Sequence, residues 1–381
     1  MPKRQNFTSV QLSHHIPTAN LKPMRMRTGF ELVIPHKTSS VFASKAKKAG
    51  RITAIDPQLK LITITYADNT IDVFEYGEIA GDASGKIINH KIKLMPHLGV
   101  GSVIKPGDII TYHSEFFNYD PITRQLAWCH GIPTNVAIMA KDVTLEDSSA
   151  VSAELAQKMS FESIYARPVT ISTDMVIDTF ADVGTSVKFN DSLIRLKYED
   201  TENIIGEVDE LFDDLKQIEY RSKHDGTIFS IQVFHVAESL NPSITRFINK
   251  VTYRNRRKAL VTKGTLKEDV HSSVTRVSEG TRVRGTQLSE TDVLIIFNIK
   301  TTISYGIGDK CVFDSSLKSV NGRIEHQPMM TESGLKIDAI FSANSVFNRI
   351  INSPQLTGIM NRVLEQAENE VLEMYFGKDE N

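Results

Sequence analysis

Alternating hydrophobic and polar positions dominate the first third of the chain and predict β-strands. Ile62, Ile64 and Tyr66 alternate with threonines, which is the period of a strand with one buried face. The preceding segment, 51–55, is followed by Asp56-Pro57-Gln58, a sequence typical of a turn, so we expect a hairpin. The same reasoning predicts further strands at 71–74, 109–110 and 293–300.

Hydrophobic residues at helical spacing mark three candidate helices. The first two are 150–159 and 208–218, and the clearest is at the C-terminus. One apolar stripe runs along this last helix, formed by Leu356, Ile359, Met360, Val363, Leu364, Val371 and Leu372. We expect the stripe to be buried in the core, although a helix at a chain end could also dock a partner.

The composition is that of a globular protein. The 381 residues suggest two or three domains at roughly 150 residues each. With 40% hydrophobic and 24% charged residues, the chain differs from disordered sequences. It has no apolar segment for a secretory signal and no stretch of about 18 apolar residues for a membrane span. Cys129 and Cys311 are too few for a disulfide framework or a four-cysteine zinc site, so we expect a reducing, cytosolic setting.

Charge is unevenly distributed along the chain. The net charge of -2 argues at first against a nucleic-acid partner. Residues 1–60, however, hold eleven basic and two acidic side chains, and residues 246–285 hold eleven basic and three acidic ones. Residues 199–214 carry eight acids and no base. A polyanion could therefore bind two basic surfaces, and the alternative is that these are solvated faces of a mixed-charge protein.

Common catalytic motifs are absent from the sequence. There is no phosphate-binding loop, no glycine-rich dinucleotide fingerprint, no H-E-x-x-H and no G-x-S-x-G. No aspartate cluster is present to hold a catalytic magnesium ion. His14 and His15 are adjacent and would point to opposite faces of a strand, so they do not suggest a metal site. If the protein takes part in phosphoryl chemistry, we expect the metal ligands to come from elsewhere.

Two lysines near the C-terminal third form a candidate binding site. Lys310 follows Gly308-Asp309 after the strand at 293–300, and Lys318 comes eight residues later. A fully extended chain would separate them by about 26 Å. Asp314-Ser315-Ser316 has the chemistry of a loop, so the chain can fold back and bring the two ammonium groups together. They could clamp a polyphosphate or a nucleic-acid end, or they could be two solvated surface lysines.

Seven short motifs follow one another along the chain. They are R-T-G-F-E at 27–31, V-I-K-P-G-D at 103–108, L-E-D-S at 145–148, V-G…L-I at 183–194, G-T-I…Q-V-F at 226–234, G-D-K…K at 308–318 and P-M…I-D-A-I…N…R at 328–349. In this order, over residues about 25 to 365, they resemble the C-terminal half of the β subunit of multisubunit DNA-directed RNA polymerase, the second-largest subunit. The chain resembles one piece of a split β subunit, an arrangement found in giant tailed bacteriophages.

This resemblance implies a mixed, β-rich fold. Its core would be a double-psi β-barrel that binds the hybrid, with an inserted flap or wall domain and a C-terminal helix. Residues 1–160 would form the first part of the hybrid-binding region and barrel. Residues 161–255 would be a reduced flap, and residues 256–381 would complete the barrel with the lysine loop and the C-terminal helix.

The resemblance also implies partners and a location. A β′-like subunit would hold the catalytic Mg²⁺ through an aspartate triad, and a separate chain would supply the N-terminal part of β. The complex would bind template DNA, nascent RNA and nucleoside triphosphates, without a membrane, and this chain would be inactive alone. We expect it in the cytoplasm of the infected host, with packaging in the virion as an additional location.

The resemblance assigns roles to five residues. Lys310 and Lys318 would contact the RNA 3′ end and the phosphates of the incoming nucleotide. Arg349 would bind the triphosphate, because a guanidinium fork matches phosphate oxygens, although it could also be a surface arginine. Glu146 and Asp147 would lie near the second Mg²⁺ and bind it through water. The alternative for this acidic pair is stabilisation of the helix expected from residue 150, and both roles are compatible.

Two departures from the family pattern bear on the site. The family's loop R-H-G-N-K is replaced by Asp314-Ser315-Ser316-Leu317-Lys318, which loses an arginine and a glycine and puts a DNA contact in doubt. The family's glutamine-rich element corresponds here to residues 11–17, where His14 or His15 could take over an RNA-backbone contact. The alternative function is a non-catalytic β-barrel protein that binds nucleic acid or packs in a virion, which would need only the basic segments.

Overall fold

The computed structural model of the chain is β-rich, with 44% strand, 20% helix and sheets that curl into half-barrels. This confirms the predicted β-rich class. The structure describes residues 18–23, 25–26, 28–83, 86–121, 123–129, 131–142, 144–198, 217–262, 272–313, 317–348 and 353–377.

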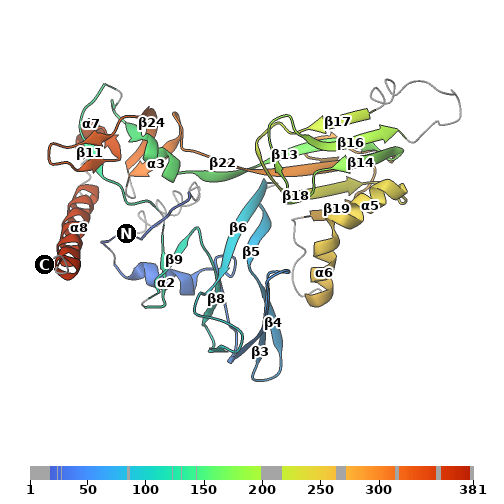
Figure 1. Cartoon of the computed structure of the whole chain (residues 1–381), viewed down its shortest axis with the longest axis horizontal. Coiled ribbons are helices and arrows are strands. Elements are labelled where there is room, and N and C mark those ends of the chain that lie inside the picture. The colour runs from blue at the N-terminus through green and yellow to red at the C-terminus, as the bar shows by residue number, and fades with distance from the viewer. Residues whose placement is uncertain are drawn as a thin grey trace. The chain divides into compact units, whose positions relative to one another are not determined.

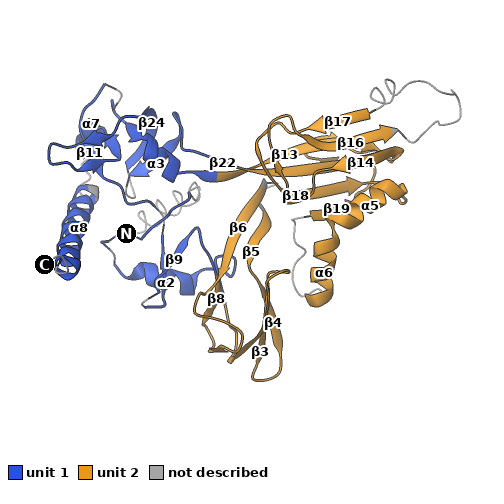
Figure 2. Ribbon diagram, in the orientation of Figure 1, with its two compact units in different colours: residues 1–44, 112–161, 303–381 blue, residues 45–111, 162–302 orange. Residues whose placement is uncertain are grey.

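Two compact units make up the structure, and each is assembled from separate segments of the chain (Figure 2). Unit 1 comprises residues 1–44, 112–161 and 303–381, and unit 2 comprises 45–111 and 162–302. The chain leaves unit 1 after residue 161, next to the boundary that the resemblance suggests at 160. The three-part division by resemblance stays a prediction.

Unit 2 contains most of the strands in the described part of the chain (Figure 1). One sheet has the order β4 (Ile71–Glu75), β3 (Leu61–Tyr66), β2 (Gly50–Asp56) and β7 (Val103–Ile104). A second has the order β1 (Ala43–Lys45), β8 (Ile109–His113), β6 (Lys86–Leu94) and β5 (Gly77–Ala83). The chain passes from one unit to the other within β1 and again within β8.

The later part of unit 2 is built on two further sheets and a small ladder. One has the order β13 (Phe161–Ser172), β22 (Asp292–Ile303), β18 (Gly226–His235) and β15 (Ser186–Val187), and β19 (Ser272–Arg276) pairs with β18. The other has the order β14 (Met175–Phe180), β16 (Ser192–Tyr198) and β17 (Gln217–Arg221). The ladder is β20 (Arg282–Val283) with β21 (Thr286–Gln287).

The predicted hairpin near residue 56 is confirmed. Strands β2 and β3 pair antiparallel, with Ile52 opposite Ile64. The Asp56 carboxylate accepts hydrogen bonds from the backbone N–H groups of Gln58 and Leu59, at 2.8 and 2.9 Å. An aspartate that binds the backbone two and three residues ahead stabilises a turn, as its sequence context suggested. The strands predicted at 71–74, 109–110 and 293–300 are also present, as β4, β8 and β22.

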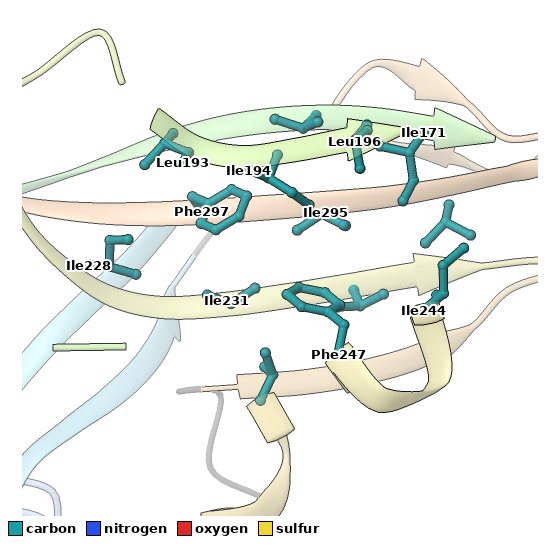
Figure 3. Close-up of a cluster of buried hydrophobic side chains, with 14 of the residues drawn as sticks. Ile171, Leu193, Ile194, Leu196, Ile228, Ile231, Ile244, Phe247, Ile295 and Phe297 are labelled. Carbon is teal, nitrogen blue, oxygen red and sulfur yellow. The ribbon is translucent and has the colours of Figure 1, made fainter. Parts of the chain in front are cut away.

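The largest apolar cluster lies in unit 2 (Figure 3). Side chains from β16, β18 and β22 meet those of helix α5 (Pro242–Val251), and most of them are fully buried. Phe247 of α5 packs edge-on against Phe180 of β14, with ring centroids 4.7 Å apart. At about 25 cal/mol per Å² of buried apolar surface, a cluster of this kind is the main stabilising contribution to a domain.

Unit 1 is built around a five-stranded sheet. Its order is β11 (Val136–Ile138), β27 (Ala339–Phe341), β12 (Ser148–Ser152), β24 (Leu317–Glu325) and β23 (Lys310–Phe313). Two small ladders accompany it: β9 (Phe117–Tyr119) with β10 (Leu126–Trp128), and β25 (Met329–Met330) with β26 (Lys336–Ile337). The described helices of this unit are α2 (Phe30–Lys37), α3 (Ala153–Lys158), α7 (Ala343–Asn348) and α8 (Ser353–Phe376).

The helix predicted at 150–159 is only partly correct. Residues Ser148–Ser152 form strand β12, and α3 begins at Ala153. The Ser152 hydroxyl accepts a hydrogen bond from Leu155 N–H at 3.1 Å, so Ser152 is the N-cap. Ala150 and Val151 are buried between β24 and β27, and this tertiary pairing determines the strand. The helix predicted at 208–218 falls largely on residues outside the described part.

The C-terminal helix is confirmed, but the prediction that its apolar stripe is core is wrong. In α8 the stripe residues remain exposed, from 39% for Leu364 to 62% for Val371. The opposite, polar face makes the contacts: Arg25 pairs with Glu368 at 2.6 Å, and Met26 N–H donates to Asn361 at 2.7 Å. Periodicity reports that a helix is amphipathic, and not which surface covers it.

Candidate functional site

Lys310 and Lys318 lie on one face of the β23–β24 hairpin in unit 1. The two strands pair antiparallel, with Lys310 opposite Val320 and Val312 opposite Lys318. These four residues are exposed, whereas Cys311 and the residue opposite it, Ser319, face the interior. The lysines are thus diagonal neighbours, about 7–8 Å apart at the backbone. The prediction that the chain folds back between the two lysines is confirmed.

The acidic pair lies beside this hairpin on the same sheet. Strand β12 begins directly after Asp147 and runs parallel to β24, with Ser148 next to Val320. The Val320 N–H donates to the Asp147 carbonyl at 2.9 Å. Because Val320 also lies opposite Lys310, the acidic turn and the lysine are separated by two strand spacings, about 10 Å. Four of the five predicted site residues therefore lie on two paired strands of this sheet or in the turn that leads into the next strand, β12.

Both members of the acidic pair are exposed at this position. Glu146 has φ 49°, in the left-handed region, so the backbone turns sharply before β12 starts. The predicted helix beginning at residue 150 is not there, and the pair precedes a strand instead. Stabilisation by a helix dipole is therefore not the role of these carboxylates.

A network of hydrogen bonds holds the turn before Lys310. The Asp309 carboxylate accepts from Gly306 N–H at 2.8 Å, and Gly308 adopts φ 88°. The buried Asn321 of β24 fixes both sides of the turn: its backbone N–H donates to Asp309 O at 2.9 Å, and its side chain donates to Gly306 O at 3.0 Å. Asn321 also accepts from Gly308 N–H at 2.8 Å through its carbonyl. These hydrogen bonds fix the backbone conformation of the turn that leads into Lys310.

Asn321 was missed in the sequence, although a signal for it exists. In β24 the buried positions alternate, and Leu317, Ser319 and Asn321 occupy them. A polar amide at an inward position of an alternating strand needs hydrogen-bond partners. Tyr305 has a similar supporting place, since its hydroxyl donates to Asp309 O at 3.2 Å.

The interior side of the hairpin does not offer a reactive nucleophile. Burial raises the pKa of the Cys311 thiol above its ordinary value. Burial also raises the pKa of the Tyr305 hydroxyl strongly, and the neighbouring thiol adds to the effect. Both groups stay protonated at neutral pH, whereas a cysteine nucleophile needs its thiolate form.

Several predicted residues lie outside the described part of the chain. These are Arg349, the loop residues 314–316, and His14 and His15. Within the described ranges, no group of three or more histidine, cysteine, aspartate or glutamate side chains is arranged to hold a metal ion. Among those same residues, no helix combines the length and the apolar character needed to cross a bilayer.

No protein-family model matches the chain, and no curated protein matches its sequence.

Proposed function

We propose that this chain is a β-subunit fragment of a multisubunit DNA-dependent RNA polymerase. The supporting observation is the hairpin that presents Lys310 and Lys318 on one exposed face, with Glu146 and Asp147 in the turn that leads into the adjacent strand β12. Two ammonium groups at this spacing suit the phosphates at an RNA 3′ end and on an incoming nucleotide. The acidic turn suits a hydrated Mg²⁺ ion brought in with the triphosphate.

In the proposed reaction the RNA 3′ oxygen attacks the α-phosphorus of a nucleoside triphosphate. The new bond joins that oxygen to the α-phosphorus, the bond from the α-phosphorus to the bridging oxygen breaks, pyrophosphate leaves, and the proton of the 3′ hydroxyl passes to solvent. The lysines position the two reactants and neutralise charge on the phosphates, which is the main source of acceleration in phosphoryl transfer. Arg349 would add a guanidinium fork to the triphosphate.

The catalytic Mg²⁺ would be held mainly by a β′-like partner with an aspartate triad, and a further chain would supply the N-terminal part of β. The curled sheets around the site would belong to a double-psi β-barrel, as the family resemblance implies. This chain would then be inactive alone and active in the host cytoplasm or after delivery with the virion.

The test is the double variant K310A/K318A in the assembled complex. We expect templated RNA synthesis to be abolished while the variant still co-purifies with the same large partners. The matched control is K105A/K188A, which removes two exposed lysines of unit 2. Full activity of K310A/K318A would overturn the assignment of the site.

Purification separates this proposal from the alternative of a non-catalytic nucleic-acid-binding or virion protein. A polymerase fragment should co-purify with a partner that contains an aspartate triad. A stable chain that never joins such a partner, and that supports no RNA synthesis in any fraction, would favour the alternative.

A further inference from the structure

Basic side chains are concentrated on two consecutive helices of unit 2, α5 and α6 (Tyr253–Thr262), both labelled in Figure 1. Over residues 242–262 the chain carries six basic side chains and no acidic one: Arg246, Lys250, Arg254, Arg256, Arg257 and Lys258. The structure separates these cations into two groups of three, and the two groups have different surroundings.

Three of the cations have structural roles. Lys258 is 5% exposed and forms an ion pair with Glu75 of β4, which ties α6 to the neighbouring sheet. Arg256 donates to the carbonyl and the side-chain oxygen of Asn249, both at 2.8 Å, and so joins α6 to the last turn of α5. Lys250 pairs with Asp182 at 3.4 Å.

The other three cations, Arg246, Arg254 and Arg257, are exposed and have no acidic partner among the described residues. Arg254 and Arg257 are three residues apart, so they lie on the same side of α6. Arg257 lies over the ring of Tyr253, 5.9 Å from its centroid, and Tyr253 is itself 60% exposed. The outward side of α6 thus combines guanidinium groups with an accessible aromatic ring.

The placement of these arginines does not stabilise the helices. Neither α5 nor α6 has an acidic residue in its first turn, and Arg254 lies in the first turn of α6, at the positive end of its dipole. Arg246 and Lys250 are a like-charge pair at i,i+4, which destabilises a helix by a few tenths of a kcal/mol. An anion bound at this surface would relieve both unfavourable interactions.

The surface is also rigidly held. On α5, Ile244, Phe247 and Val251 are buried in the main core of unit 2, and Figure 3 shows Ile244 and Phe247 pointing from the helix into that cluster. On α6, Asn255 donates to Ser272 O at 2.6 Å from the side opposite Tyr253. The cations are therefore presented on a fixed scaffold, which limits the entropy lost on binding.

We propose that Arg246, Arg254 and Arg257, with Tyr253, form a binding surface for the backbone of single-stranded nucleic acid. Guanidinium groups match phosphate oxygens, and an exposed ring beside them can stack on a base of any identity. An anionic membrane is the less suitable ligand, because α6 has only ten residues and its exposed aliphatic residues, Leu260 and Val261, are confined to its last turn. This surface belongs to unit 2 and does not depend on the proposed function of the lysine hairpin in unit 1.

The experiment measures binding of short fluorescein-labelled RNA and DNA single strands to the full chain by fluorescence anisotropy across a series of salt concentrations. We expect R246Q/R254Q/R257Q to bind at least about tenfold more weakly than wild type at low salt. The slope of log affinity against log salt should fall by about 2, since each lost phosphate contact removes about 0.7 from a single-strand slope. A comparison of the affinities for the RNA and DNA strands shows whether binding depends on the sugar.

The matched control is K93Q/K105Q/K188Q, which removes the same charge from scattered exposed lysines of unit 2 and should keep at least half of the wild-type affinity. The variant Y253A should weaken binding and leave the salt slope unchanged, as expected for a stacking contact. Thermal unfolding of each variant shows that its fold is retained, because the substituted side chains are exposed.

Three results would overturn the inference. The first is equal affinity of the arginine variant and wild type. The second is loss of strand binding only in K310A/K318A, which would leave the proposed function intact and place all binding at the hairpin. The third is arginine-dependent binding to phosphatidylserine vesicles without binding to either strand.

Discussion

Helices α5 and α8 are both amphipathic, yet only one of them buries its apolar face. In the ten-residue α5, Ile244, Phe247 and Val251 are buried against the sheets of unit 2. In the 24-residue α8, a longer apolar stripe stays exposed, and the polar face contacts residues 25 and 26. The difference teaches that the length of an apolar stripe does not determine its burial. What matters is whether a second apolar surface faces the helix.

Among the substitutions that test this difference between α5 and α8, the largest loss of stability is expected at Phe247. Its replacement by alanine should destabilise the protein by about 3–5 kcal/mol, because it removes a buried ring and leaves a cavity in the core. The matched variant is F376A in α8, where the ring is 66% exposed and the expected change is below about 0.5 kcal/mol. Urea unfolding monitored by circular dichroism gives both values, and equal losses would contradict the distinction between the two helices.

A smaller effect is expected at Asn241, which starts α5. Its side chain accepts from Ile244 N–H at 2.8 Å and donates to the carbonyls of Thr173 and Met175, at 2.9 and 2.7 Å. The variant N241A should lose about 2 kcal/mol, because it removes the helix cap and leaves two carbonyl groups without this donor.

The comparison variant for Asn241 is N361A in α8. Asn361 accepts from Met26 N–H and donates to Thr357 O, both near solvent, so its loss should change unfolding by less than about 1 kcal/mol. A larger loss for N361A than for N241A would show that α8 is held more firmly than its exposure indicates.

The smallest effect is expected at Arg25, which pairs with Glu365 and Glu368 on the polar face of α8, at 3.7 and 2.6 Å. These groups are partly exposed, so R25Q should change the free energy of unfolding by less than about 1 kcal/mol. Any difference from wild type should disappear at high salt, where surface ion pairs are screened. If R25Q instead lowered the free energy of unfolding by more than about 2 kcal/mol at every salt concentration, Arg25 would stabilise the protein by packing as well as by its charge.

The candidate site shows a similar division between local pattern and tertiary structure. The loop chemistry between Lys310 and Lys318 was enough to predict that the chain folds back. The approach of Glu146 and Asp147 could not be derived from spacing, because it results from the parallel pairing of β12 with β24, about 170 residues away along the chain. The support from Asn321 depends on the same pairing.

The basic segment at 246–285 was visible in the sequence as a charge excess. Which of its cations are available was not, because ion pairs and caps form between residues that are distant in the chain. Lys258 pairs with Glu75 across 183 positions, whereas Arg254 and Arg257 are left at the surface.

The sequence by itself determined the local elements of this protein: the β2–β3 hairpin, the strands with period two, the helical character of residues 353–376 and the return of the chain between the two lysines. These depend on neighbouring residues, whose propensities and turn chemistry act over a few positions. The tertiary structure decided that residues 148–152 form a strand, that the α8 stripe is exposed, and which charged residues meet. Burial and pairing depend on surfaces contributed by distant segments, and no local pattern specifies them.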